Sequence, residues 1–280
     1  MLSTIWNTVL FYPFLNLMII LYNFLGENLG FAILGIAVIA RILMIPLVKR
    51  QTEMTKKMAS LKPQMDELQK KYANNKEKLS QEQVKLYKKV GYNPLGCIGT
   101  FIPQLIILSV LIAVIRAVTS SSLDGLYPWV KELTGIVEGA SINTKFLFWE
   151  LTSSYKEVAA EFGNFSMKSL PYIGLSLLVG VTQYFTSVFT QKMQNLSAPA
   201  KKVEKGGSQT EELQAKMQKS TILLLPLMTV FFPISMPAAL GWYWMIQSLL
   251  LVVQYLSLDF DKAKKGVQNL WDILVKKNEK

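Results

Sequence analysis

Long apolar blocks alternate with lysine-rich stretches along the 280-residue chain. A transmembrane helix needs roughly 20 mostly apolar residues, and apolar blocks of about this length with few charges are typical of spans. The predicted spans are residues 29–48, 98–118, 170–190, 220–237 and 238–257. The pattern therefore predicts an all-α integral membrane protein built on a five-helix transmembrane bundle.

The segments between the predicted spans differ in charge. Basic side chains outnumber acidic ones in residues 49–92, in the loop 191–219 and in the tail 258–280, whereas acidic side chains are the more numerous in residues 119–169. Because cytoplasmic loops of membrane proteins collect Lys and Arg, the three basic segments are predicted to be cytoplasmic. Residues 119–169 are then an extracytoplasmic segment. This arrangement places the chain in the cell membrane with its N-terminus outside and its C-terminus in the cytoplasm.

Two segments outside the spans are predicted to be helical. In residues 49–92, apolar side chains recur every three or four residues on both sides of a polar break at residues 73–75, which predicts a cytoplasmic hairpin of amphipathic helices. Residues 1–26 are uncharged and rich in Trp, Tyr and Phe. Trp and Tyr favour the headgroup region. Because Pro13 divides these residues into two pieces that are each too short to span, we interpret them as an interfacial helical segment; a sixth spanning helix is the alternative.

One charge, Arg41, lies well inside the span 29–48. A charge at the bilayer centre costs from about 2.5–3.5 kcal/mol on insertion scales to about 10–17 kcal/mol in simulations. At 1.5 Å per residue, Arg41 lies about 10 Å from the inner end of its span, and Gln104 and Gln183 lie at a similar depth in theirs. One interpretation is a water-filled cavity between the helices. The other is snorkelling of Arg41 toward the inner headgroups, together with ordinary hydrogen bonds between helices.

The distribution of the other polar side chains favours the cavity. They recur at helical spacing at this depth on three spans: Thr100 with Gln104; Gln183 with Ser187 and Gln191; and Trp244 with Gln247 and Ser248. The outer halves of these helices are more nearly apolar. The sequence therefore predicts a hydrophilic groove that is open to the cytoplasm, closed toward the outside and lined by Arg41.

Composition argues against several other classes of protein. The chain has no histidine and one cysteine, and its predicted spans contain no Asp or Glu, so we expect no metal centre, no cofactor and no enzymatic activity. A phosphate-binding G-x-x-x-x-G-K-[ST] loop is also missing, and ATP use is not expected. The 30 basic against 19 acidic side chains follow from cytoplasmic loops, so nucleic-acid binding is not needed to explain them.

Several short motifs occur in a specific order along the chain. They are Arg41-Ile-Leu-Met-Ile-Pro46-Leu47, Leu61-Lys62-Pro63-Gln64-Met65, Asn93-Pro94, Gln191-Lys192-Met193, Pro237-Ala238-Ala239-Leu240 and Tyr243-Trp244. In this order and on this topology, they make most of the chain similar to the YidC family of membrane protein insertases. Ser248 stands where this family commonly has asparagine.

The resemblance implies a cytoplasm-open groove whose arginine is Arg41, a mobile cytoplasmic hairpin and an interfacial N-terminal helix. It also implies insertion of nascent membrane proteins, by moving their N-terminal tails or short hairpins into lipid, alone or beside the Sec translocon, the ribosome and a targeting receptor. The client-binding groove is then expected at Arg41, Thr100, Gln104, Gln183, Ser187, Gln191, Tyr243, Trp244 and Ser248. A passive membrane assembly scaffold is the alternative function. A solute transporter is less well supported, because no internal repeat is evident.

Overall fold

Helices make up most of the described chain. The computed structural model describes residues 2–73, 75–89, 101–196 and 226–258. By length and composition, the helices that could cross a membrane are Ser3–Phe24, Leu29–Arg50, Leu170–Thr190 and Ala238–Ser257, and two shorter apolar helices are Pro103–Thr119 and Pro226–Ser235. The chain is therefore an all-α, multi-pass membrane protein, as predicted. The predicted spans 98–118 and 220–237 begin in residues 98–100 and 220–225, which lie outside the described residues.

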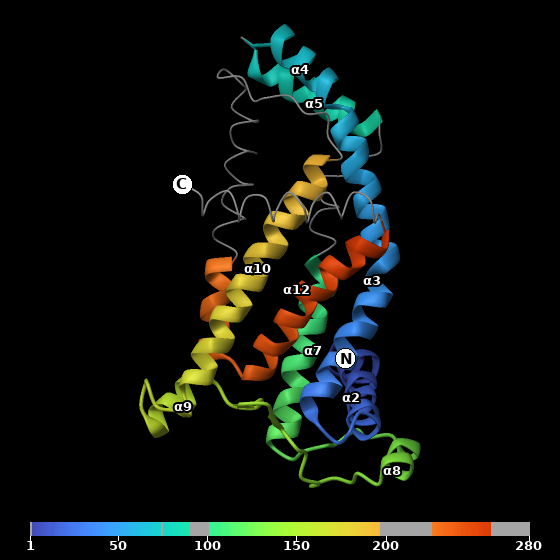
Figure 1. Ribbon diagram of the computed structural model, residues 1–280. Helices are drawn as coiled ribbons and strands as arrows, with labels where there is room; N and C mark the ends of the chain where they lie inside the picture. The colour runs from blue at the N-terminus through green and yellow to red at the C-terminus, as the bar shows by residue number, and fades with distance from the viewer. Residues whose placement is uncertain (1, 74, 90–100, 197–225, 259–280) are drawn as a thin grey trace. The chain divides into compact units, whose positions relative to one another are not determined.

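The described residues form two compact units. Unit 1 contains those of 1–43, 103–183 and 226–251, and unit 2 contains those of 44–102, 184–225 and 252–280. Three long helices contribute their first part to unit 1 and their last part to unit 2: α3 (Leu29–Ser60), α10 (Leu170–Leu196) and α12 (Ala238–Leu258) (Figure 1). Helices α3 and α10 thus continue past the predicted span ends at 48 and 190. Residues 197–219 and 259–280 of the predicted loop and tail lie outside the described chain.

The N-terminal segment is one continuous helix. It begins as α1 (Leu2–Trp6), continues through a π-helical turn, η1 (Asn7–Phe11), and goes on as α2 (Tyr12–Phe24). Pro13 has no N–H to donate and lies in the first turn of α2, directly after the wider π-helical turn that accommodates it. The expectation that Pro13 would divide this segment into two short pieces is therefore wrong.

Helix α2 contacts the segment 119–169 at both of its ends. Near its start, Asn16 is only 2% exposed; its Nδ2 donates to the Gly125 carbonyl at 2.9 Å, and its Oδ1 accepts from the Tyr127 N–H at 2.7 Å. Near its end, the Tyr22 hydroxyl accepts from the Asn143 N–H at 2.8 Å. These bonds connect residues 16–22 of α2 to one segment of chain.

Residues 119–169 contain local structure that the hydrophobic pattern did not predict. Their elements are α8 (Pro128–Thr134), β1 (Lys145–Phe146), β2 (Trp149–Glu150) and α9 (Tyr155–Phe162). The two strands pair antiparallel, with Phe146 opposite Trp149. Helix α9 begins with a capping box, in which the Ser154 hydroxyl and the Glu157 carboxylate each accept from the other residue's backbone N–H.

This segment supplies acceptors to helices that begin beside it. The first N–H groups of a helix have no acceptor within the helix, and near lipid each such group needs another partner. The Leu29 N–H, at the start of α3, donates to the Asn143 carbonyl at 3.1 Å, and the Ala238 N–H, at the start of α12, donates to the Ser153 carbonyl at 2.9 Å. The start of α10 is joined to the same segment, because Trp149 Nε1 donates to the Pro171 carbonyl at 2.8 Å. Helices α3, α10 and α12 therefore begin at one end of unit 1 (Figure 1).

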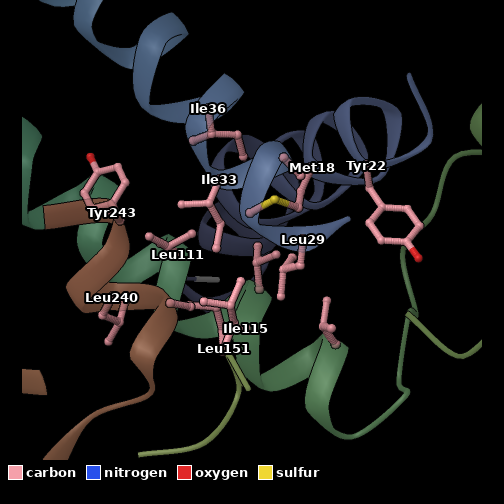
Figure 2. Close-up of a cluster of buried hydrophobic side chains, with 14 of the residues drawn as sticks. Met18, Tyr22, Leu29, Ile33, Ile36, Leu111, Ile115, Leu151, Leu240 and Tyr243 are labelled. Carbon is pink, nitrogen blue, oxygen red and sulfur yellow. The ribbon is translucent and has the colours of Figure 1, made fainter. Parts of the chain in front are cut away.

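The hydrophobic core of unit 1 gathers side chains from α2, α3, α12, the segment 119–169 and helix α7 (Phe101–Thr119). Figure 2 shows part of it, including Met18, Ile33, Leu111, Leu151 and Tyr243. Small residues bring the chain segments close together. A Cβ built at Gly30 would lie 2.2 Å from the Phe146 ring, so glycine allows β1 to pack on the first turn of α3.

Unit 2 contains the rest of α3 and the helices α4 (Lys62–Lys71) and α5 (Lys76–Lys89). Helix α3 ends one residue before Leu61, because Pro63 lies in the first turn of α4, where its ring and missing N–H disfavour continuation of the preceding helix. Helices α4 and α5 are separated by residues 72–75, where the sequence predicts the polar break at 73–75. The first arm of the predicted hairpin is thus formed by two helices.

Replacing Asn16 with leucine is expected to destabilise unit 1. The substitution keeps the number and branching of the side-chain heavy atoms but leaves the Tyr127 N–H and the Gly125 carbonyl without their buried partner, which costs about 1–3 kcal/mol in the free energy of unfolding. Asn23→Leu is the matched control, because Asn23 makes a single 3.3 Å bond, to the Thr134 carbonyl. Unfolding in mixed micelles measures both variants, and equal losses would contradict the prediction.

Candidate functional site

The predicted groove residues that the structure brings together lie in unit 1, around helix α12. Tyr243, Trp244 and Ser248 lie on α12, Arg41 lies on α3 and Gln183 lies on α10. Tyr243 and Ser248 are buried, at 0% and 4% exposed, and the other three are half-buried. Polar side chains are therefore enclosed between apolar helices.

Arg41 is held by the backbone of α12. Its Nη2 donates to the Gln247 carbonyl at 2.5 Å, and the Gln247 side chain donates in turn from Nε2 to the Ala37 carbonyl at 3.1 Å. Gln247 is 5% exposed. Each helix thus donates from a side chain to a main-chain oxygen of the other, and one acceptor of the Arg41 guanidinium is a neutral carbonyl.

Two bonds order the contacts between α3 and α12. Trp242 on α12 donates from Nε1 to the Gly30 carbonyl at 3.0 Å, and the Gln247 side chain donates to the Ala37 carbonyl further along. The contacts follow the same order on both helices, so α3 and α12 run in the same direction.

The Tyr243 hydroxyl adjoins the same cation. It lies within electrostatic reach of Arg41 and beside the side-chain amides of Gln104, on α7, and Gln247. Among the described residues, the Tyr243 hydroxyl and Gln247 Oε1 are buried without a hydrogen-bond partner of good geometry. Buried polar atoms in native proteins are nearly always hydrogen-bonded to protein or water, so these two atoms provide hydrogen-bonding capacity for a guest molecule.

A second polar contact joins α12 to α10. Gln183 Oε1 accepts from Trp244 Nε1 at 3.2 Å and from the Ser248 hydroxyl at 3.0 Å. Ser248 also lies 3.1 Å from the Trp244 carbonyl one turn earlier. The Ser248 hydroxyl is therefore long enough to reach Gln183.

Helix α12 carries polar groups on two adjacent faces. Tyr243 and Gln247 lie toward Arg41, and Trp244 and Ser248 lie toward Gln183. By spacing alone Gln247 shares one stripe with Trp244 and Ser248, and it was not among the predicted groove residues. It was visible as an amide in an apolar span, but its role depends on its contact with α3, which the sequence does not show.

The other predicted groove residues are not joined to this cluster by described contacts. Thr100 lies outside the described residues. Ser187 lies on α10 in unit 2, and Gln191 lies on α10 where the backbone alone is described. Their assignment to the groove stays a prediction.

The cluster can bind an anion without metal or acid chemistry. It offers a cation, an indole, a phenol, a hydroxyl and amides, and the predicted spans contain no Asp or Glu. Within the described part of the chain, no three His, Cys, Asp or Glu side chains come together as a metal site requires. A guest carboxylate would supply the opposite charge that a partly buried guanidinium favours.

Comparison with known proteins gives a match over most of the chain. The family model described as 60Kd inner membrane protein matches residues 20–265. ALBINO3-like protein 1 of Arabidopsis thaliana, a chloroplast protein, is 29% identical over 89% of this chain and 47% of its own length. Membrane protein insertase YidC 2 of Bacillus anthracis is 27% identical over 89% of this chain and 79% of its own length. Membrane protein insertase MisCA of Bacillus subtilis is 27% identical over 93% of this chain and 82% of its own length. The chain thus spans about half the length of the chloroplast relative.

Gln183→Leu is expected to destabilise the α10–α12 contact more than Ser248→Ala. The first substitution removes the acceptor of two donors and should cost about 1–2 kcal/mol. The second removes one donor and should cost about 0.6 kcal/mol, the average for hydrogen bonds between membrane helices. The free energy of unfolding in mixed micelles measures both losses. A Ser248→Ala loss as large as that of Gln183→Leu would show that the shared acceptor is not the centre of the contact.

Proposed function

Because this chain belongs to the 60Kd inner membrane protein family, we propose that it inserts other proteins into the membrane in which it lies. The YidC-family resemblance seen in the sequence is confirmed by the family match and by relatives named membrane protein insertases. For this chain the activity, the clients and the partners are inferences, supported by the polar cluster around α12.

The observation that carries the mechanism is the position of Arg41. Its guanidinium lies against a neutral main-chain oxygen among predicted spans that contain no acid. A carboxylate in the N-terminal tail of a client, about 4 Å away at an effective dielectric constant of about 20, would gain about 4 kcal/mol. That gain offsets part of the cost of bringing the tail, or a short hairpin, partway across the bilayer.

Water is part of the proposed mechanism. The buried Tyr243 hydroxyl and Gln247 Oε1 are best satisfied by water or by a polar client segment. Such a wet groove is proposed to be open to the cytoplasm and to comprise Arg41, Thr100, Gln104, Gln183, Ser187, Gln191, Tyr243, Trp244 and Ser248, with Gln247 added by its contacts with α3.

The proposed topology follows the charge pattern, with the N-terminus outside and the C-terminus in the cytoplasm. The end of unit 1 at which α3, α10 and α12 begin is then the outer end. Helix α2 bonds to the outer segment at Asn16 and again at Tyr22. These bonds hold residues 16–22 of α2 beside the outer segment. The helix is long and apolar enough to cross a membrane, but the interfacial location of residues 1–26 is proposed because their Trp and Tyr side chains favour the headgroup region.

Release into lipid is proposed to drive the reaction without ATP. Burying the apolar helix of a client in hydrocarbon is favourable by roughly 25 cal/mol per Å² of apolar surface. The chain then acts as a chaperone-like insertase, without covalent chemistry. Its proposed partners are nascent membrane proteins and lipids, together with the Sec translocon, the ribosome and a targeting receptor.

A passive assembly scaffold is the main competing function. It needs no contact between the client and the polar cluster. Photo-crosslinking groups placed at Gln183 and, as a control, at the lipid-exposed Leu177 of the same helix distinguish the two. If the chain is an insertase, the group at position 183 should crosslink to nascent client chains. If it is a scaffold, no such crosslink should form.

Arg41→Ala is expected to reduce insertion of clients with acidic tails at least tenfold, because the charge attraction of about 4 kcal/mol is lost. Insertion of the same clients with neutralised tails should change little. Arg41→Lys should retain most of the activity, because the charge remains. Reconstituted proteoliposomes with a protease-protection readout measure all three.

Arg116→Ala is the matched control. Arg116 is exposed near the C-terminal end of α7, and its substitution is expected to leave insertion unchanged. Equal insertion of acidic-tailed clients by the Arg41→Ala variant and the unchanged protein would falsify the attraction mechanism.

Cysteine labelling tests the groove itself. In a Cys97→Ser background, cysteines at Gln104 and Gln183 should react with a charged thiol reagent added from the cytoplasmic side and not from the other side. Leu177→Cys, at an exposed position of α10 within a stretch long enough to span, is expected to face lipid and should react from neither. Labelling of positions 104 and 183 from the outside would contradict a groove that is closed there.

A further inference from the structure

The segment 119–169 exposes apolar side chains at two tips. Leu147 and Phe148, at the tip of the β1–β2 hairpin, are 70% and 77% exposed, and Phe165 and Met167, in the turn between α9 and α10, are 80% and 87% exposed. They are four of the five most exposed large apolar side chains in the described part of the chain. Single exposed apolar side chains are ordinary on protein surfaces, but two such pairs need a physical reason.

The conformation of the hairpin makes its tip more unusual. Pairing of Phe146 with Trp149 leaves a two-residue loop, Leu147–Phe148. Such loops require a positive φ at the first position and favour Gly, Asn or Asp there; Leu147 has a φ of +52°. Leucine in this position adds backbone strain to the exposure of an apolar side chain. A purely aqueous loop would avoid both costs with glycine or asparagine.

Both tips lie at the level at which helices enter the membrane. Apolar stretches long enough to span begin at Leu29, Leu170 and Ala238. The segment that carries the hairpin bonds to Leu29 and Ala238 themselves, and Trp149 bonds to the first turn of α10 through Pro171. The plane of one membrane surface therefore passes beside the hairpin.

The second tip is tied to the same plane. Phe165 and Met167 precede Leu170 by five and three residues, and the Leu170 N–H donates to the Ser166 carbonyl at 3.0 Å. The Ser169 hydroxyl lies 3.0 Å from the Asn164 carbonyl. These bonds fold the turn against the start of α10, so its two apolar side chains cannot extend far from the membrane surface.

Basic side chains accompany both tips. Lys145 is exposed at the base of the hairpin, and the Lys168 ammonium lies 3.6 Å from the centre of the Phe162 ring. An apolar side chain in the acyl region with a lysine beside it at headgroup level is the arrangement by which peripheral segments bind lipid. The exposed surface also continues into Leu170 and Leu177 of α10, which are 44% and 56% exposed within a stretch long enough to span.

We propose that the Leu147–Phe148 tip and the Phe165–Met167 turn insert into the lipid leaflet at the end of unit 1 where α3, α10 and α12 begin. The occupant of this apolar surface is lipid, because the surface borders the lipid-facing side of α10 and carries lysines suited to phosphate headgroups. Insertion anchors the segment 119–169 to the bilayer, and it does not depend on the proposed insertase activity.

Site-directed spin labelling of the full chain in phosphatidylcholine and phosphatidylglycerol nanodiscs tests this proposal. In a Cys97→Ser background, nitroxides at Phe148→Cys and Phe165→Cys should be relaxed by oxygen, which concentrates in lipid, and little by a water-soluble nickel chelate. Glu161→Cys, exposed on α9, is the aqueous control. Leu177→Cys, exposed on α10, is the lipid control, and the two test sites should show an oxygen-to-nickel ratio at least fivefold above that of Glu161→Cys.

A second measurement uses the unchanged chain. A diazirine carried on a lipid acyl chain should label the peptides that contain Phe148 and Phe165 in the same nanodiscs, and mass spectrometry locates the labels. The proposal is overturned if both test sites relax like Glu161→Cys and their peptides stay unlabelled. It is equally overturned if the nitroxides are protected from both reagents, because the tips then pack against protein.

Discussion

The bond between the Arg41 guanidinium and the Gln247 carbonyl fixes the helix on which the polar cluster depends. In lipid there is no hydrophobic drive between helices, and their association relies on packing and hydrogen bonds. Helix α12 is tied to α3 by this charge-assisted bond and by the Gln247–Ala37 bond, and to α10 by Gln183. Because α12 is fixed by these bonds, the positions of Tyr243, Trp244 and Ser248 on it are fixed as well.

The segment 119–169 meets the same constraint at the other end of these helices. Leading N–H groups near lipid need acceptors, and the carbonyls of Asn143, Leu151 and Ser153 provide them. Polar groups in the middle of unit 1 are thus combined with capped helix starts at one end. This asymmetry supports the proposal of a groove that is open at one side only.

The sequence predicted the features that depend on local composition. Spans follow from runs of apolar residues, and Arg41 and Gln183 were identified because polar side chains are rare at that depth. The role of Gln247 and the division of α12 into two polar faces depend on contacts with helices distant in sequence, which spacing alone does not reveal.

Some local features were missed for different reasons. The Ser154–Glu157 capping box was readable as S-x-x-E, and it marks the start of α9. The β1–β2 hairpin had no such signal. Its loop is Leu147–Phe148, whereas Asn-Gly or Asp-Gly at these positions would have predicted a turn. At Pro13 the usual rule predicts a helix break, but a π-helical turn removed the conflict.

The separation of 206 residues between Arg41 and its acceptor residue Gln247 has a consequence for the synthesis of the protein itself. At about 5–20 residues per second, α3 emerges from the ribosome about 10–40 s before Gln247 does. During that interval the carbonyl that accepts from Arg41 in the finished fold has not yet been synthesised. The contact between α3 and α12 can therefore form only late in the synthesis of the chain.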